Sequence, residues 1–264
     1  MSGKSLRKIT AKDVSGLVEF IKNTVENAGC KGVVVGLSGG IDSAVVTKLC
    51  VDALGPKKVM NVFMPTSVTA TDDYMATKNL SKLWGTEYKV VDIQPAVDAF
   101  TAALFSNIAT PLEKGNISAR CRMIVLFNKA KKTNYLVAGT SNKSELMMGY
   151  FTKFGDGACD FVPMVDLYKT QVWEVAKLIG VPQKFIDMVP TAGLWEGQTD
   201  ESEMGITYHD LDIVLNDMEQ SLSDDEIANH VGLSVERVAE LRSQVKKMEH
   251  KRFPAICPNV PVDN

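Results

Sequence analysis

The chain has 264 residues, of which 45% are hydrophobic and 23% charged, and its formal net charge is −3. That composition is typical of a soluble globular protein with one large or two small domains. The slightly acidic balance argues against a broad face that binds nucleic acid, and no apolar run approaches the roughly 18 residues that a membrane span requires. We therefore expect neither nucleic acid nor a membrane among its partners.

The five cysteines are scattered along the chain and form no C-x-x-C pair. An odd number without regular spacing indicates free thiols in a reducing compartment, and it indicates neither a zinc site nor a disulfide framework. The first ten residues lack the apolar core of a signal peptide. We expect a cytoplasmic protein.

Short apolar runs alternate along the chain with segments whose apolar residues recur at helical spacing. A first helix is expected over residues 13–28. Strands follow at residues 33–37, 59–64, 88–93 and 135–138, and helices between them at residues 43–54, 72–84, 95–105 and 119–131. This alternation predicts an α/β fold with a doubly wound, mainly parallel sheet covered by helices on both faces. From residue 208 onward the pattern adds further helices at the C-terminus.

The stretch GLSGGIDS, residues 36–43, lies where the first predicted strand passes into a helix. In an open parallel sheet this edge is where ligands bind. The helix start offers unpaired backbone N–H groups and the positive end of the helix dipole, and paired glycines let an anion approach the backbone closely. With two serine hydroxyls beside it, the loop is a candidate phosphate site.

The loop has Asp42 where a P-loop would have its lysine, and it does not match the dinucleotide pattern G-x-G-x-x-G. A carboxylate beside phosphate requires a cation between them, and Mg²⁺ is commonly held by one or two carboxylates together with phosphate oxygens. The alternative is a glycine-rich turn in which Asp42 merely caps the helix. That alternative does not explain the two serines and the aspartate together.

SGGIDS, residues 38–43, resembles the pyrophosphate loop of the N-type ATP pyrophosphatases, which cleave ATP between its α and β phosphates and adenylylate an acceptor. Further segments resemble, in the same order, those of ammonia-dependent NAD synthetases within that superfamily. They are GNISARCRM, GTSNKSE, FTKFGDG, PTAGLWEGQTDE, GITY and HKR. The resemblance runs over most of the chain, from about residue 13 to residue 254.

This resemblance implies a five-stranded, mainly parallel sheet of the adenine nucleotide alpha hydrolase-like type, in one NAD synthetase domain over residues 1–264 without a glutaminase domain. It implies a homodimer that converts deamido-NAD to NAD with ATP, Mg²⁺ and ammonia, releasing AMP and pyrophosphate. Carried over residue by residue, it implies ATP contacts from Gly36, Leu37, Ser38, Gly39, Gly40, Ile41, Asp42, Ser43, Thr140, Lys169 and Thr191. The resemblance also implies that Asp42 and Glu145 bind magnesium. It implies that deamido-NAD is bound by Arg120, Lys153, Asp160, His250 and Lys251.

Asp42 and Lys169 are the expected groups for the attack on ATP, and Asp160 is our candidate for taking the proton of ammonium. The alternative for Asp160 is an ion pair with Lys153 that braces the loop. Residues 194–205 resemble a mobile lid of the family, whose closure would protect an adenylate from water.

Two other functions are consistent with parts of the sequence. Residues 224–247 read as a helix-turn-helix, so a nucleotide-sensing DNA-binding regulator is one alternative. Another is a different ATP pyrophosphatase, such as a tRNA thiolase or a queuosine-pathway ligase. The absence of paired cysteines and of a basic surface argues against these relatives.

Overall fold

The computed structural model of the protein describes residues 6–104, 109–191 and 199–255. In these residues a parallel sheet of four strands has the order β3-β2-β1-β4. The strands are β1 (Gly32–Gly36), β2 (Val59–Phe63), β3 (Glu87–Val90) and β4 (Tyr135–Ala138). The chain adds β2 and β3 on one side of β1 and then places β4 on the other side. The strand order thus reverses between β1 and β4, which is where open α/β sheets bind their ligands.

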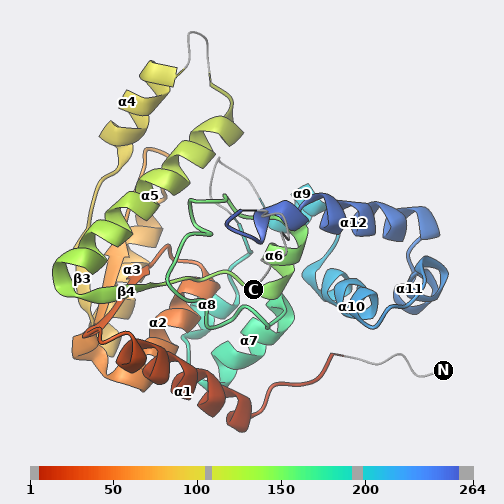
Figure 1. Cartoon of the computed structure of the whole chain (residues 1–264), viewed down its shortest axis with the longest axis horizontal. Coiled ribbons are helices and arrows are strands. Elements are labelled where there is room, and N and C mark those ends of the chain that lie inside the picture. Colours follow the sequence, from red (N-terminus) through yellow and green to blue (C-terminus); the bar gives the residue numbers. More distant parts are fainter. Residues whose placement is uncertain (1–5, 105–108, 192–198, 256–264) are drawn as a thin grey trace, which may run out of the picture.

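Successive side chains of β1 enter opposite faces of the sheet, which explains why the strand is apolar throughout. Val33 and Val35 belong to a core that includes residues of α1 (Ala11–Asn27) and α2 (Ile41–Leu54). Val34 belongs to another, with residues of α4 (Gln94–Leu104) and α5 (Pro111–Thr133). Figure 1 shows these two pairs of helices on either side of the sheet. The predicted α/β class is confirmed.

The described residues contain four strands, whereas five were expected. Phe161 forms only an isolated parallel bridge with Ala138 at the free edge of β4. The carboxylate of Asp160 accepts the Val137 N–H at 2.7 Å, so a side chain takes the place of a backbone carbonyl there. Pro163 follows closely and has no N–H with which to extend a ladder.

Most predicted helices lie within a few residues of their expected limits, including α3 (Thr71–Trp84). The exception is α5, which begins at Pro111 and not at residue 119. Thr110 caps this helix, and its side chain and that of Glu113 form a reciprocal capping box. Because proline is favoured in the first turn of a helix, these residues mark the true start. Residue 105, the expected end of the helix before it, lies outside the described residues.

The C-terminal part forms a helical lobe with its own apolar core, which includes Leu211, Leu215, Ile227 and Leu241. Figure 1 shows this lobe beside α6 and α7, on the far side of the molecule from α4. The remaining helices are α6 (Lys143–Met148), α7 (Lys169–Leu178), α8 (Gln183–Ile186), α9 (Asp200–Met204), α10 (Tyr208–Glu219), α11 (Asp224–Val231), α12 (Val235–Lys247) and the 3₁₀ turns Pro56–Lys58 and Glu249–Lys251. In the described part of the chain no helix combines the length and the apolar character needed to cross a membrane.

The expected helix-turn-helix corresponds to α11 and α12, which are separated by Gly232 in a left-handed conformation. Its arginines bind within the protein. Arg242 contacts the Asp224 carboxylate at 2.7 Å, and Arg237 donates to the Met204 carbonyl at 2.5 Å. Both arginines therefore form contacts that stabilise the helical lobe.

Candidate active site at the switch point of the sheet

The loop after β1 has the shape that the sequence predicts. Gly39 has φ of 104°, which favours glycine, and Gly40 occupies the N-cap position of α2. The first N–H groups of α2 have no partner within the helix, so they face outward from the end of the loop. A built Cβ at Gly39 would lie 3.3 Å from the Asp73 carboxylate, so the space beside this residue is tight as well.

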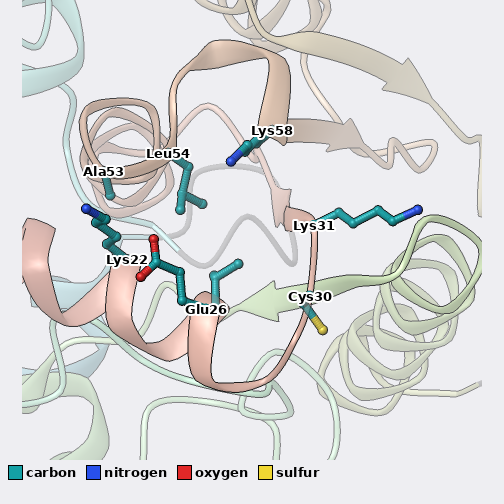
Figure 2. A pocket seen from close by; sticks show the side chains of 8 residues that line it. Lys22, Glu26, Cys30, Lys31, Ala53, Leu54 and Lys58 are labelled. Carbon is teal, nitrogen blue, oxygen red and sulfur yellow. The ribbon is translucent and has the colours of Figure 1, made fainter.

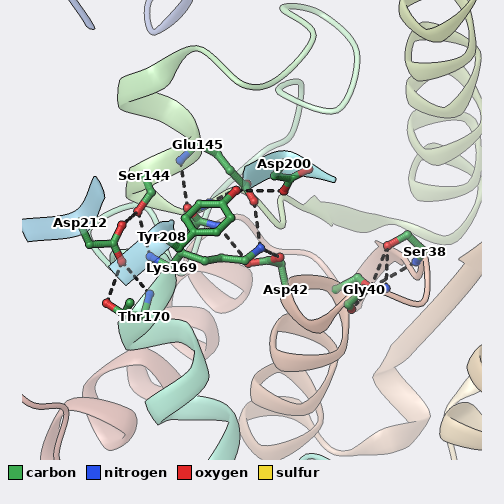
Figure 3. Close-up of polar contacts among 12 residues, drawn as sticks. Ser38, Gly40, Asp42, Ser144, Glu145, Lys169, Thr170, Asp200, Tyr208 and Asp212 are labelled. Carbon is green, nitrogen blue, oxygen red and sulfur yellow. Dashed lines mark hydrogen bonds and ion pairs between the residues drawn. The ribbon is translucent and has the colours of Figure 1, made fainter. Parts of the chain in front are cut away.

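The two serines of the loop, expected to donate to phosphate, bond to the loop itself in this structure. Ser43 Oγ donates to the Gly40 carbonyl at 2.9 Å and lies 3.3 Å from Ser38 Oγ. The Ser38 N–H in turn donates to Ser43 Oγ at 3.2 Å. Figure 3 shows these bonds at the edge of the cluster described next. The hydrogen bonds of the two serines therefore stabilise the conformation of the loop to which an anion would bind.

Three ionisable side chains from three helices meet beside this loop (Figure 3). Asp42 comes from α2, Glu145 from α6 and Lys169 from α7. The Lys169 ammonium lies 2.5 Å from an Asp42 oxygen and 3.2 Å from a Glu145 oxygen. The Lys169 side chain is 3% exposed, and each carboxylate side chain is 16% exposed. The structure therefore brings together three residues that are far apart in the sequence.

Burial strongly affects the proton equilibria of this cluster. It raises the pKa of Glu145 to about 8, with the attraction of Lys169 opposing the shift and the charge of Asp42 adding to it. Burial alone would lower the pKa of Lys169. The two neighbouring carboxylates outweigh that effect, and the pKa of this ammonium is raised. Lys169 is therefore a fixed positive charge over the whole neutral range.

Asn142 and Tyr208 belong to this cluster, although sequence reasoning missed both. Asn142 caps α6 through the Glu145 N–H at 3.0 Å, and its amide also donates to Asp42 at 3.0 Å. The Tyr208 ring lies 5.3 Å from the Lys169 ammonium, and its hydroxyl donates to Asp200 at 3.0 Å. The spacing N-K-S-E is a readable capping box and would have indicated Asn142. Tyr208 is the last residue of the GITY segment that resembles the family, but nothing in that segment indicates a contact with Lys169.

The donor set of this cluster fits a magnesium ion. Mg²⁺ prefers carboxylate oxygens and usually takes one or two of them together with phosphate oxygens and water. Asp42 and Glu145 already place one oxygen each within contact distance of a single cation, the Lys169 ammonium. Both carboxylate side chains also remain 16% exposed. These two residues would hold the ion.

Three of the expected deamido-NAD residues form a hydrogen-bonded chain. The Arg120 guanidinium donates to the Lys153 carbonyl at 3.2 Å, and the Lys153 ammonium donates to the His250 carbonyl at 2.8 Å. Lys251 donates to the carbonyls of Gly149 and Phe151. The structure thus brings these residues close together. The ammonium groups of Lys153 and Lys251 already donate to backbone carbonyls of the chain.

Asp160 lies apart from this chain, at the free edge of β4, with one oxygen on the Val137 N–H. The alternative ion pair between Lys153 and Asp160 is not formed, because Lys153 is turned toward His250. Thr140 lies two residues after the end of β4, on the same sheet edge as the loop after β1. Beside it, Gly139 is closely covered by Cys159, where a built Cβ would lie 2.6 Å from the sulfur.

Thr191 is exposed and precedes residues 192–198, which lie outside the described residues. Residues 194–198 of the lid-like segment 194–205 therefore lie outside the described residues as well, whereas residues 199–205 are described. Its described end contains α9, whose Asp200 accepts the Tyr208 hydroxyl.

A pocket of about 370 Å³ lies at the opposite edge of the sheet (Figure 2). It lies between the end of α1, the end of α2 and the residues that precede β1 and β2. Its lining is Lys22, Val25, Glu26, Cys30, Lys31, Ala53, Leu54 and Lys58. None of these is an expected site residue, and its lysines are exposed. We therefore place the chemistry at the switch point and not in this pocket.

The chain is similar to known proteins over nearly its whole length. The family model described as NAD synthase matches residues 13–255. An NH3-dependent NAD(+) synthetase of Pyrococcus furiosus is 46% identical, over 94% of this chain and 95% of the relative. A solved NMN synthetase of Francisella tularensis has a TM-score of 0.83 and 37% identity, covering 94% of this chain and 98% of its own. A solved NH3-dependent NAD synthetase of Campylobacter jejuni, in complex with nitrate, has a TM-score of 0.77 and 34% identity, with the same coverage. The chain therefore belongs to the NAD synthase family.

Proposed function

We propose that this chain is an ammonia-dependent NAD synthetase that uses ATP to convert the carboxylate of deamido-NAD into the carboxamide of NAD. The products are NAD, AMP and pyrophosphate. Family membership supports the reaction. The observation that carries it to the residue level is the cluster of Asp42, Glu145 and Lys169 beside a loop suited to phosphate.

In the first step an oxygen of the nicotinate carboxylate attacks the α-phosphorus of ATP, and the bond to the β-phosphate oxygen breaks. Negative charge builds on the departing pyrophosphate. The N–H groups at the start of α2 and the Lys169 ammonium are fixed positive groups suited to that charge. When bound by Asp42 and Glu145, magnesium would supply further positive charge at the phosphates. Removing one preorganised donor of this kind typically costs about 3 kcal/mol of activation free energy.

In the second step ammonia attacks the acyl adenylate, and AMP leaves from the tetrahedral intermediate. Ammonium dominates near neutral pH and is no nucleophile, so a base must take its proton. We keep Asp160 in this role. One of its oxygens binds the Val137 N–H, and its side chain is exposed, which leaves the other oxygen accessible. Its replacement by asparagine should slow amide formation and spare adenylate formation.

The substrate contacts follow the same assignment. Arg120, Lys153, His250 and Lys251 contact deamido-NAD together with Asp160. The ATP contacts come from residues 36–43, Thr140, Lys169 and Thr191. In the chain on its own, Lys153 and Lys251 bind backbone carbonyls. Binding of an anionic dinucleotide would therefore exchange those carbonyls for phosphate or carboxylate oxygens, which form stronger bonds with ammonium.

We further propose that the enzyme is a cytoplasmic homodimer and that residues 1–264 form one NAD synthetase domain. Large apolar side chains are exposed on α4 and α5, where Phe100 is 48%, Leu112 60% and Ile124 53% exposed. A second copy of the chain would cover them, and exposed apolar patches of this kind commonly mark interfaces. The cysteines of the described residues are all free thiols, which fits a reducing compartment.

The test supplies ATP, Mg²⁺ and ammonium together with one acceptor at a time, and follows AMP and the amidated product by chromatography. Deamido-NAD should give NAD and AMP in equal amounts. Nicotinate mononucleotide is the second acceptor because of the similarity to a protein described as an NMN synthetase. A GMP precursor and tRNA serve as further acceptors, and glutamine replaces ammonium in one arm. AMP formation with any other acceptor at a higher rate than with deamido-NAD would overturn the proposal.

A further inference from the structure

A fully buried carboxylate, that of Asp212 on α10, binds the N-terminal ends of two other helices. Asp212 is 0% exposed. One of its oxygens accepts the Ser144 hydroxyl of α6 at 2.5 Å, and the other accepts the N–H and the hydroxyl of Thr170 of α7 at 2.8 and 2.7 Å. Figure 3 shows this carboxylate between the two helix starts.

Each of these two helices carries one member of the active-site cluster, directly beside the residue that Asp212 binds. Ser144 precedes Glu145, and Thr170 follows Lys169. The two helix starts are also joined to each other, because the Lys169 N–H donates to Ser144 Oγ at 2.9 Å. One carboxylate thus fixes the backbone positions from which Glu145 and Lys169 project.

A buried carboxylate is costly unless its oxygens are hydrogen bonded. Here three donors and the positive end of the α7 dipole satisfy it. The same helix carries another buried carboxylate, Asp217, which is 2% exposed and binds His230 of α11 at 2.5 Å. That contact holds the helical lobe together and involves no residue of the cluster. The two aspartates therefore allow an internal comparison between a purely structural role and a role in the site.

We propose that Asp212 is a positioning residue for adenylyl transfer, which holds Lys169 and Glu145 at the distances that the reaction with ATP requires. The inference rests on the proposed function. In this role Asp212 connects the C-terminal lobe to the reaction at the sheet edge, although α10 contributes no charged group of its own to the cluster.

The substitution Asp212→Asn keeps the shape of the side chain and removes one acceptor. If its amide faces Thr170, it meets the Thr170 N–H, which is itself a donor, and that bond is lost. If the amide faces Ser144, it can donate to Ser144 Oγ, but the Ser144 hydroxyl loses its carboxylate acceptor. One of the bonds that the carboxylate accepts is thus lost in either orientation, together with its negative charge. The matched control is Asp217→Asn on the same helix.

The assay follows the exchange of labelled pyrophosphate into ATP, dependent on deamido-NAD, with thermal unfolding measured on the same samples. For Asp212→Asn we expect the maximal exchange rate to fall about 10- to 100-fold, the loss typical of groups that orient active-site ligands, with a smaller change in KM for ATP. Asp217→Asn should lower Tm and leave the maximal rate within about twofold of the wild type.

Equal maximal rates in the two variants would overturn the inference, whatever their Tm. If Asp212→Asn yields no folded protein, Ser144→Ala decides, because it removes the link between Asp212 and the Lys169 N–H. A retained rate in that variant overturns the inference as well, and a reduced rate with a small change in Tm supports it. A wild-type protein without exchange would instead overturn the proposed function itself.

Discussion

Replacing Lys169 by methionine should disable the site and uncover the repulsion between its two carboxylates. The ammonium lies 2.5 and 3.2 Å from Asp42 and Glu145. At pH 9, where both carboxylates are charged, each attraction is worth roughly 5–7 kcal/mol at an effective dielectric constant of about 20. Desolvation offsets much of this sum, and removal of one partner of a buried ion pair typically costs about 3–5 kcal/mol. For a protein near this size that cost lowers Tm by roughly 6–20 °C.

The cost should depend on pH and on Mg²⁺. In the wild type, burial raises the pKa of Glu145 to about 8 although Lys169 opposes the shift, so Glu145 holds a proton at pH 6 and is charged at pH 9. Without Lys169 its pKa rises further, so the variant lacks at pH 9 a favourable charge pair that the wild type has, whereas at pH 6 both proteins have a protonated Glu145. The variant should therefore lose more stability relative to the wild type at pH 9. A divalent ion can replace the missing ammonium, so Mg²⁺ should raise the Tm of Lys169→Met more than that of the wild type.

The assay is thermal unfolding at both pH values, with and without Mg²⁺, together with NAD formation. Lys143→Met is the matched control, because its ion pair with Glu219 at 2.6 Å is more exposed, with 22% of the lysine side chain accessible. Such pairs contribute about 0–1 kcal/mol. NAD formation should fall at least about 100-fold in Lys169→Met and persist in the control. Equal Tm losses in the two variants, or a loss at pH 6 as large as at pH 9, would refute the reasoning.

Three further predictions concern the metal, the loop and the dimer. Mg²⁺ affinity, measured by titration calorimetry, should fall as pH drops through about 8, because Glu145 must lose a proton to bind the ion; a constant affinity from pH 6.5 to 9 would contradict this. Gly39→Ala should cost about 1–2 kcal/mol of stability and weaken ATP binding, because φ is 104° and Asp73 lies close, whereas Gly16→Ala, at an open helical position, serves as the control. Ile124→Glu should shift the mass measured by light scattering from dimer to monomer, since the residue is 53% exposed on α5; an unchanged mass would exclude this face.

The local parts of the fold could be predicted from the sequence because their signals are local. The apolar run at residues 33–37 and the loop that follows it predict a strand, a turn and a helix start, and β1 and α2 have these positions. The start of α5 was also readable, since Thr110, Pro111 and Glu113 form a capping signal that outweighs Gly115 within the helix.

The contacts across the fold could not be predicted in the same way. Lys169 meets Asp42 across 127 positions of sequence, and no spacing rule relates the two. Ser144 and Asp212 are 68 positions apart and meet only because α10 packs against α6. The expected fifth strand differed for a similar reason, since the pairing of Asp160 with the Val137 N–H depends on tertiary position.

The most direct test of the account is the pyrophosphate exchange of a double variant, Asp42→Asn with Glu145→Gln, at saturating Mg²⁺ and deamido-NAD. Both substitutions keep the shape of the side chains and remove the charges that face Lys169. We predict a folded protein whose exchange is indistinguishable from a reaction without enzyme, because neither residue can then hold a divalent ion at the phosphates. Exchange at a rate close to that of the wild type would show that the cluster is not the centre of the chemistry.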